Sequence, residues 1–108
     1  MVSEVSPREL AKLLEERSPR LVLLDVREDE ERATARIEPS LHIPMNDVPS
    51  RLAEIPRDAK LVIYCHHGSR SLMVAGYLEG EGFDDVTNLS GGIDAWSVRV
   101  DPKVARYD

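Results

Sequence analysis

The apolar and polar positions of this chain alternate in a way that predicts strands separated by helices. The clearest apolar run covers residues 61–64, and its β-branched and aromatic side chains are typical of a strand buried on both faces. A short polar turn containing Gly68 follows it, and apolar residues then recur at helical spacing from Ser71 to Leu78. Gly82 stands where such a helix would end. The pattern therefore predicts a strand, a tight loop and a helix in the second half of the chain.

Three further runs are candidate strands, and they cover residues 21–24, 41–43 and 86–89. Segments with helix signals separate these runs. Strands that alternate with helices favour a mainly parallel sheet covered by helices on both faces. We therefore expect a three-layer α/β fold, and 108 residues suffice for a single domain over residues 1–108.

The helix signals are strongest near the beginning of the chain. Ser6 and Glu9 can form a capping box around Pro7, which suits a first helical position. Val5 stands where it can pack on the first turn as a hydrophobic staple. Four acidic residues at 28–31 also suit the positive end of a helix dipole, but an exposed helix face is the simpler interpretation.

The remaining helices are expected to be short. Asn46 or Asp47 is a candidate cap for a helix that ends before the turn at residues 56–58. A flexible hinge at 90–92 leads into a last helical segment. The tail over residues 101–108 has no periodicity, and we expect it to be irregular.

Composition and charge narrow the classes of function. A hydrophobic content of 42% with 31% charged residues describes a soluble globular protein, and no apolar run approaches the roughly 20 residues that cross a bilayer. A net charge of −6 argues against a nucleic-acid partner. The single cysteine cannot form an internal disulfide, and no secretory signal is visible at the N-terminus. A cytoplasmic location without membrane contact is the expectation.

The most reactive side chain of the chain is predicted to be Cys65, which directly follows the run at 61–64. Ligands of parallel α/β sheets bind at the carboxyl ends of the strands, where this cysteine falls. Converging N–H groups of the tight loop, the helix dipole beyond it and the charge of Arg70 would all favour the thiolate. Gly68 lets the bare backbone approach an anion closely. The alternative interpretation is a buried cysteine that only packs.

Two histidines next to this cysteine invite a metal interpretation. His66 and His67 are adjacent on a turn, where side chains tend to diverge, and His42 is the only other histidine. No second cluster completes a four-ligand site, so we expect no metal and no cofactor. The two histidines are instead expected to line the pocket, to tune its charge or to contact substrate.

Four motifs together resemble the rhodanese-like sulfurtransferases over nearly the whole chain. In chain order they are L-L-D-V-R-E at 23–28, H-I-P at 42–44, Y-C-H-H-G-S-R-S at 64–71 and G-G-I-D-A-W at 91–96. The tail V-D-P-K-V-A-R-Y at 100–107 is similar to that of single-domain members. The cysteine loop, together with the double glycine and tryptophan, is the specific part of this match.

The resemblance implies a five-stranded, mainly parallel sheet and a two-step cycle of sulfur transfer. In that cycle Cys65 takes a sulfane sulfur as a persulfide and yields it to a thiophilic acceptor, while Arg70 orients an anionic donor such as thiosulfate. Amides between residues 66 and 70 would hold the outer sulfur. Asp25 and Arg27 are expected to brace the pocket. The candidate substrate-binding residues are His66, His67, Gly68, Ser69 and Ser71.

The match has one departure, at residues 35–40. The family usually has G-H-I-x-G-A there, and this chain has A-R-I-E-P-S. The altered run lies outside the cysteine loop, so we expect catalytic competence to survive.

Two other functions stay open at this point. Cysteine phosphatases and arsenate reductases share a thiolate, an amide nest and an arginine, but related phosphatases have five residues between cysteine and arginine. Here four residues separate Cys65 from Arg70, which leaves room for a sulfur atom and crowds a phosphoryl group. The second alternative is a relay module that receives persulfide from a donor protein and passes it to an acceptor protein. The expected partners are therefore a small anionic sulfur donor or such a protein.

Overall fold

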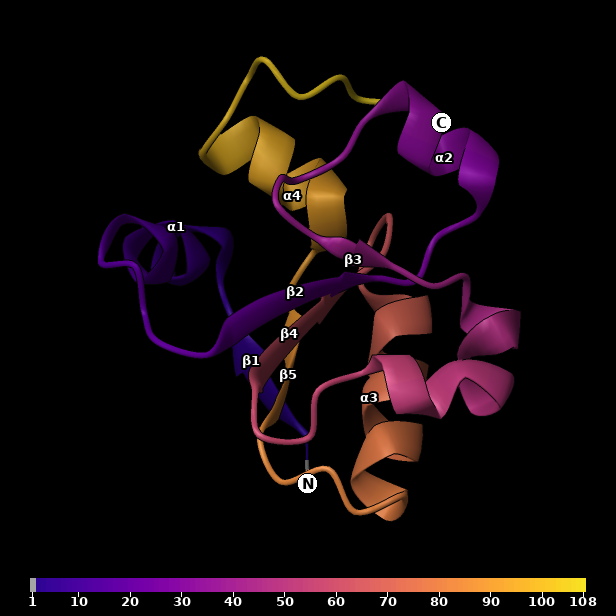
Figure 1. Cartoon of the computed structure of the whole chain (residues 1–108). Coiled ribbons are helices and arrows are strands. Elements are labelled where there is room, and N and C mark those ends of the chain that lie inside the picture. Colours follow the sequence, from indigo (N-terminus) through magenta and orange to yellow (C-terminus); the bar gives the residue numbers. More distant parts are fainter. Residues whose placement is uncertain (1) are drawn as a thin grey trace.

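A sheet of five strands lies at the centre of the computed structural model, which describes residues 2–108 (Figure 1). Its strand order is β1-β5-β4-β2-β3, and every neighbouring pair is parallel. The strands are β1 (Ser3–Val5), β2 (Leu21–Asp25), β3 (Leu41–His42), β4 (Lys60–Tyr64) and β5 (Val86–Leu89). The helices are α1 (Pro7–Glu15), α2 (Asp29–Thr34), the 3-10 helix η1 (Met45–Glu54), α3 (Ser69–Gly80) and α4 (Gly92–Arg99). The predicted α/β class and parallel sheet are confirmed.

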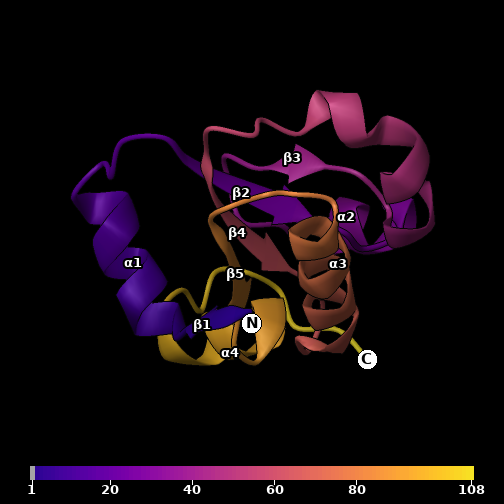
Figure 2. The same cartoon turned by 90° about the horizontal axis from the view of Figure 1, so that it is seen from below.

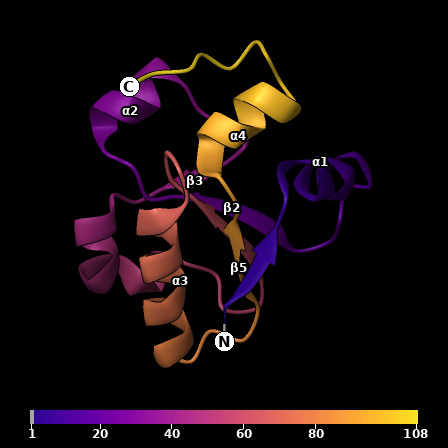
Figure 3. The same ribbon diagram turned by 180° about the vertical axis from the view of Figure 1, so that it is seen from behind.

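Helices cover both faces of the sheet, and two apolar clusters fill the layers between (Figure 2). Leu61, Ile63 and Cys65 point into the cluster under α3 and η1. Val62 and Tyr64 point to the opposite face, which α1 and α4 cover (Figure 3). This alternation along one strand places the cysteine on the α3 side.

The four predicted strands are present, and the sequence pattern missed the fifth. β1 has only three residues and pairs with β5, with Ser3 opposite Thr87. Val5 belongs to this strand and is also buried in one apolar cluster with Leu10, the expected partner of a helix staple. A run this short carries no periodicity that could be recognised.

The helix predictions were right at the start of the chain and partly wrong in the middle. Ser6 caps α1 as expected: its Oγ accepts from the Glu9 N–H at 3.1 Å, and its own N–H donates to the Glu9 carboxylate. The helix expected to begin at Asn46 or Asp47 starts at Met45 without a side-chain cap, and it is a 3-10 helix. Pro49 lies inside it, where the proline ring and the missing N–H disfavour a regular α-helix, and the backbone leaves helical geometry at Arg51.

The carboxyl ends of the three central strands meet at one edge of the sheet. β2 leads there into Asp25 and Arg27, β4 into Cys65, and β5 into the hinge at 90–92. The C-terminal tail, irregular as expected, runs from α4 back across this edge towards α2 (Figure 1). No helix within residues 2–108 has the length and apolar character needed to cross a membrane.

Candidate active site

The thiol of Cys65 is buried at the end of β4, with 1% of the residue exposed. Three hydrogen-bond donors converge on its sulfur. The Gly68 N–H lies 3.1 Å from Sγ, the Ser71 N–H 3.4 Å and the Ser71 hydroxyl 3.3 Å. Donors that all point at one sulfur stabilise it when it carries negative charge. The sequence placed Gly68 and Ser71 among the site residues, and the structure brings both to the sulfur.

The loop after Cys65 turns directly into α3, so the sulfur faces the first turn of a twelve-residue helix. Gly68 precedes the helix with φ of +105°, a conformation that favours glycine. No side chain caps the helix, and its first N–H groups are left for the sulfur site. The positive end of the helix dipole adds to their effect.

The carbonyl groups of the loop point the other way, towards the N-terminus of α4. The N–H of Ile93 donates to the Cys65 carbonyl at 2.9 Å, and that of Asp94 donates to the His66 carbonyl at 3.1 Å. Gly92 makes this contact possible, since a Cβ built on it would lie 2.5 Å from the Cys65 carbonyl oxygen. Its φ of +62° favours glycine as well. The double-glycine motif thus fixes the backbone of the cysteine loop.

Arg70 lies at the site but is already paired. Its two terminal nitrogens donate to the Glu31 carboxylate at 2.7 and 2.8 Å. These bonds from Arg70 are the main reason that the pKa of Glu31 is lowered to about 2, and they raise the pKa of Arg70 in turn. A guanidinium has five N–H donors, so Arg70 keeps three for another anion. Glu31 nevertheless neutralises much of the charge that such an anion would meet.

The C-terminal tail contributes a residue to the same site. The Tyr107 hydroxyl donates to Glu31 at 2.7 Å and accepts from Arg27 at 3.0 Å, while its ring stacks on His66 with 3.9 Å between the ring centres. Burial is the main cause that raises the pKa of Tyr107, to about 12. The tyrosine therefore links the cysteine loop to the brace at the end of β2.

Asp25 and Arg27 form that brace and do not contact Cys65. The Arg27 guanidinium uses all five of its donors: two bind Asp25 at 2.8 and 2.9 Å, and the others bind the Glu31 carbonyl, the Ala35 carbonyl and Tyr107. Both residues are fully buried. Burial disfavours the Asp25 carboxylate, but the hydrogen bonds from Arg27 outweigh burial and lower its pKa. A buried ion pair in which every arginine donor already has a hydrogen-bond acceptor has a structural role.

The brace also accommodates the altered run at residues 35–40. Ala35 accepts from Arg27 at 2.6 Å, and the Ile37 N–H donates to the Tyr64 hydroxyl at 3.2 Å. Ser40 lies 3.3 Å from the same hydroxyl. The run therefore contributes hydrogen bonds that support the buried pair and Tyr64.

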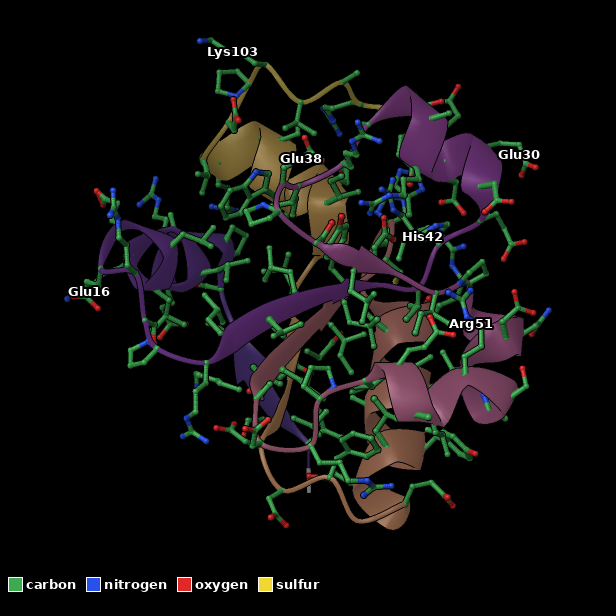
Figure 4. All side chains as sticks on the ribbon, in the orientation of Figure 1. Glu16, Glu30, Glu38, His42, Arg51 and Lys103 are labelled. Carbon is green, nitrogen blue, oxygen red and sulfur yellow. The ribbon has the colours of Figure 1, made fainter. Side chains whose placement is uncertain are left out.

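The two histidines of the loop lie together, with 3.9 Å between their ring centres, and do not diverge as expected. His67 is exposed, whereas His66 is half-buried against Tyr107. Burial, with a smaller effect of His67, lowers the pKa of His66. Residues 2–108 contain no group of three or more His, Cys, Asp or Glu side chains arranged to hold a metal ion. The ring of His42, labelled in Figure 4, lies 2.8 Å from the carbonyl of Arg27, just beyond the end of β2. Ser69 is exposed at the start of α3.

The sequence missed three residues of this site: Glu31, Tyr107 and Asn88. Glu31 belongs to a run of four acidic residues, and its neighbour Glu30 points to solvent as predicted (Figure 4). The tail motif ending in tyrosine was a signal for Tyr107, although not for its contacts. Asn88 lies in the buried strand β5 and donates to the Gly68 carbonyl at 3.2 Å.

Comparisons with known proteins agree over nearly the whole chain. A family model described as "Rhodanese-like domain" matches residues 6–99. A sulfurtransferase of Allochromatium vinosum is 39% identical over 105 residues, which cover 97% of each protein. The thiosulfate sulfurtransferase GlpE of Pseudomonas savastanoi pv. phaseolicola is 36% identical over 90 residues, 83% of each. The solved structure of a rhodanese-like domain protein from Staphylococcus aureus is 33% identical, with a TM-score of 0.84 over 99% of this chain and 100% of that one.

Replacing Gly92 by alanine should disrupt the cysteine loop, because the new Cβ would collide with the backbone of Cys65. We expect the Gly92→Ala variant to have a lower melting temperature and a changed alkylation rate at Cys65. Gly76→Ala is the matched control, since a Cβ there meets nothing within 4 Å. The Gly76→Ala variant should leave the alkylation rate of Cys65 unchanged. It should raise the free energy of unfolding by up to about 1 kcal/mol, because alanine is favoured over glycine at an exposed helix position. Equal behaviour of the two variants would contradict the role of Gly92.

The Glu31 ion pair predicts a specific dependence of stability on pH. Folding lowers the pKa of Glu31 from 4.5 to about 2, so its contribution is fully present above pH 4.5 and disappears as the pH falls towards 2. The difference in unfolding free energy between the native protein and Glu31→Gln should therefore shrink across this range, as urea titrations at several pH values would measure. The exposed Glu54→Gln variant serves as the control and should show a smaller change. Parallel curves for native protein and Glu31→Gln would refute the assignment.

Proposed function

We propose that this chain, which belongs to the rhodanese-like family, is a sulfurtransferase that carries sulfane sulfur on Cys65 from a small anionic donor such as thiosulfate to a thiophilic acceptor. The observation that carries the proposal is the convergence of two backbone N–H groups and one hydroxyl on a buried thiol at the start of a helix. Relatives named sulfurtransferases over nearly the full length support it, and one of them is named for thiosulfate. A cytoplasmic location, where a free thiol stays reduced, suits this chemistry.

The reaction proceeds in two displacements at sulfur. The Cys65 thiolate attacks the sulfane sulfur of thiosulfate, an S–S bond forms, and sulfite leaves with the electron pair of the bond that breaks. The negative charge then resides on the outer sulfur, where the N–H groups of the loop stabilise it. In the second step a thiophilic acceptor attacks that outer sulfur, and Cys65 leaves as the thiolate.

Phosphate chemistry fits the site less well, because neither of the two candidate aspartic acids, Asp25 and Asp94, is available as a general acid. Asp25 is buried against Arg27, and hydrogen bonds from Arg106 lower the pKa of Asp94. A carboxylate held in its charged form is a poor proton donor at neutral pH. The loop of four residues is short for a phosphoryl group, and this also disfavours phosphate chemistry.

A relay between proteins is the second candidate, and the pairing of Arg70 favours it. A persulfide on a donor protein does not need an unpaired cation at the site, and Glu31 already pairs with Arg70. The helix that begins at the loop also exposes large apolar side chains, at Leu72, Met73 and Tyr77. Small-molecule and protein donors would load the same cysteine.

Loading of sulfur on Cys65 is tested by the mass of the intact protein after incubation with thiosulfate. We expect the mass to increase by one sulfur atom, and cyanide treatment to remove it. Cys65→Ser should gain nothing while keeping its fold, since the substitution removes only the nucleophile. Sulfur that remains on the Cys65→Ser variant, or hydrolysis of an aryl phosphate without any loading, would reject the proposal.

Removing Arg70 should weaken binding of an anionic donor. We expect Arg70→Ala to raise the KM for thiosulfate about tenfold, which corresponds to the loss of one charge-assisted contact, while kcat changes less. The control is Arg51→Ala, which also breaks an arginine–glutamate pair but on η1. If the KM of Arg70→Ala equals that of the control, Arg70 does not bind the donor.

A further inference from the structure

Asn88 on β5 lies behind the cysteine loop and is 3% exposed. Its amide nitrogen donates to the Gly68 carbonyl at 3.2 Å and to the Glu4 carboxylate at 3.3 Å. Both partners can only accept hydrogen bonds, so the orientation of the side-chain amide is fixed. The amide oxygen therefore faces the Ser71 hydroxyl, at 2.5 Å.

The Ser71 hydroxyl has one proton and two acceptors within reach. One is the Asn88 amide oxygen, and the other is the Cys65 sulfur at 3.3 Å. When the proton points to Asn88, the serine oxygen offers a lone pair to the sulfur and can accept from the Cys65 thiol. When the sulfur is a thiolate, the proton has to turn towards it. The buried amide oxygen of Asn88 then loses its only hydrogen-bond donor among the described contacts, which costs free energy.

We propose that Asn88 is a positioning residue that sets the pH at which Cys65 becomes a reactive thiolate, by competing with the sulfur for the Ser71 proton. As long as the sulfur carries its proton, the serine proton stays on Asn88. Ionisation releases the thiol proton to solvent and turns the serine proton to the sulfur. Once Cys65 carries an outer sulfur, the negative charge moves to that atom and the serine proton returns to Asn88. The inference deepens the proposed function, since it concerns the same nucleophile.

A merely structural role of Asn88 makes a different prediction. The side chain also ties β5 to the loop through Gly68, so its removal could disturb the loop whatever Ser71 does. Competition for a proton, by contrast, requires the Ser71 hydroxyl. The effect of removing Asn88 should therefore vanish in a protein that lacks this hydroxyl.

A double-mutant cycle on the rate of alkylation of Cys65 by iodoacetamide tests the inference across a pH series. We expect Asn88→Ala to move the midpoint of the pH–rate profile down by about half a unit to one unit, because Ser71 is then free to donate to the thiolate. Ser71→Ala should move the midpoint up. Asn88→Ala made in the Ser71→Ala background should not move it further.

The matched control is Ser97→Ala, which removes a buried serine hydroxyl that donates to Val104. Its midpoint should equal that of the native protein. If Asn88→Ala does not fold, Asn88→Leu fills the same space without polar atoms and should give the same downward shift. A shift of equal size in both backgrounds, or an upward shift, overturns the inference. Alkylation needs no sulfur donor, so this outcome is independent of whether thiosulfate loads the protein.

Discussion

The direction of the backbone groups in the loop after Cys65 is the constraint on which the rest of the site depends. The N-terminus of α4 binds the carbonyls of Cys65 and His66 from outside, and only glycine at position 92 allows that approach. With the carbonyls held there, the N–H groups of Gly68 and Ser71 are left to face the sulfur. Two glycine-dependent turns thus create an anion site from neutral backbone.

The charged residues around the loop are almost entirely paired with one another. Arg27 donates hydrogen bonds to its neighbours with all five of its N–H groups, and Arg70 forms an ion pair with Glu31. Tyr107 joins the two pairs, so the tail, α2 and the loop form one network. Such a network fixes the shape of the site, while the partial positive charge that meets the sulfur comes mainly from N–H groups. This arrangement suits a reaction in which charge stays on sulfur throughout and no proton donor is needed.

Much of the fold could be predicted from sequence because its strands are apolar and its turns carry local signals. The family and the parallel sheet are confirmed, and the position of Cys65 at a strand end followed from the pattern alone. The partners of the site residues could not be predicted in the same way. Glu31 meets Arg70 across 39 positions, and Tyr107 meets Glu31 across 76. In the sequence Glu31 is indistinguishable from exposed Glu30, and Asn88 looks like a polar interruption of a buried strand.

A transferred sulfur should come to rest inside the cysteine loop, and a crystal structure of the thiosulfate-treated protein tests this most directly. One additional sulfur atom should be bonded to Cys65 Sγ and lie within hydrogen-bond distance of at least two N–H groups of the loop. The pair of Arg27 with Asp25 and the hydrogen bonds from Ile93 and Asp94 to the loop carbonyls should be unchanged. An unmodified Cys65 in protein treated with thiosulfate in the absence of an acceptor, or an added sulfur pointing away from the loop amides, would contradict the account.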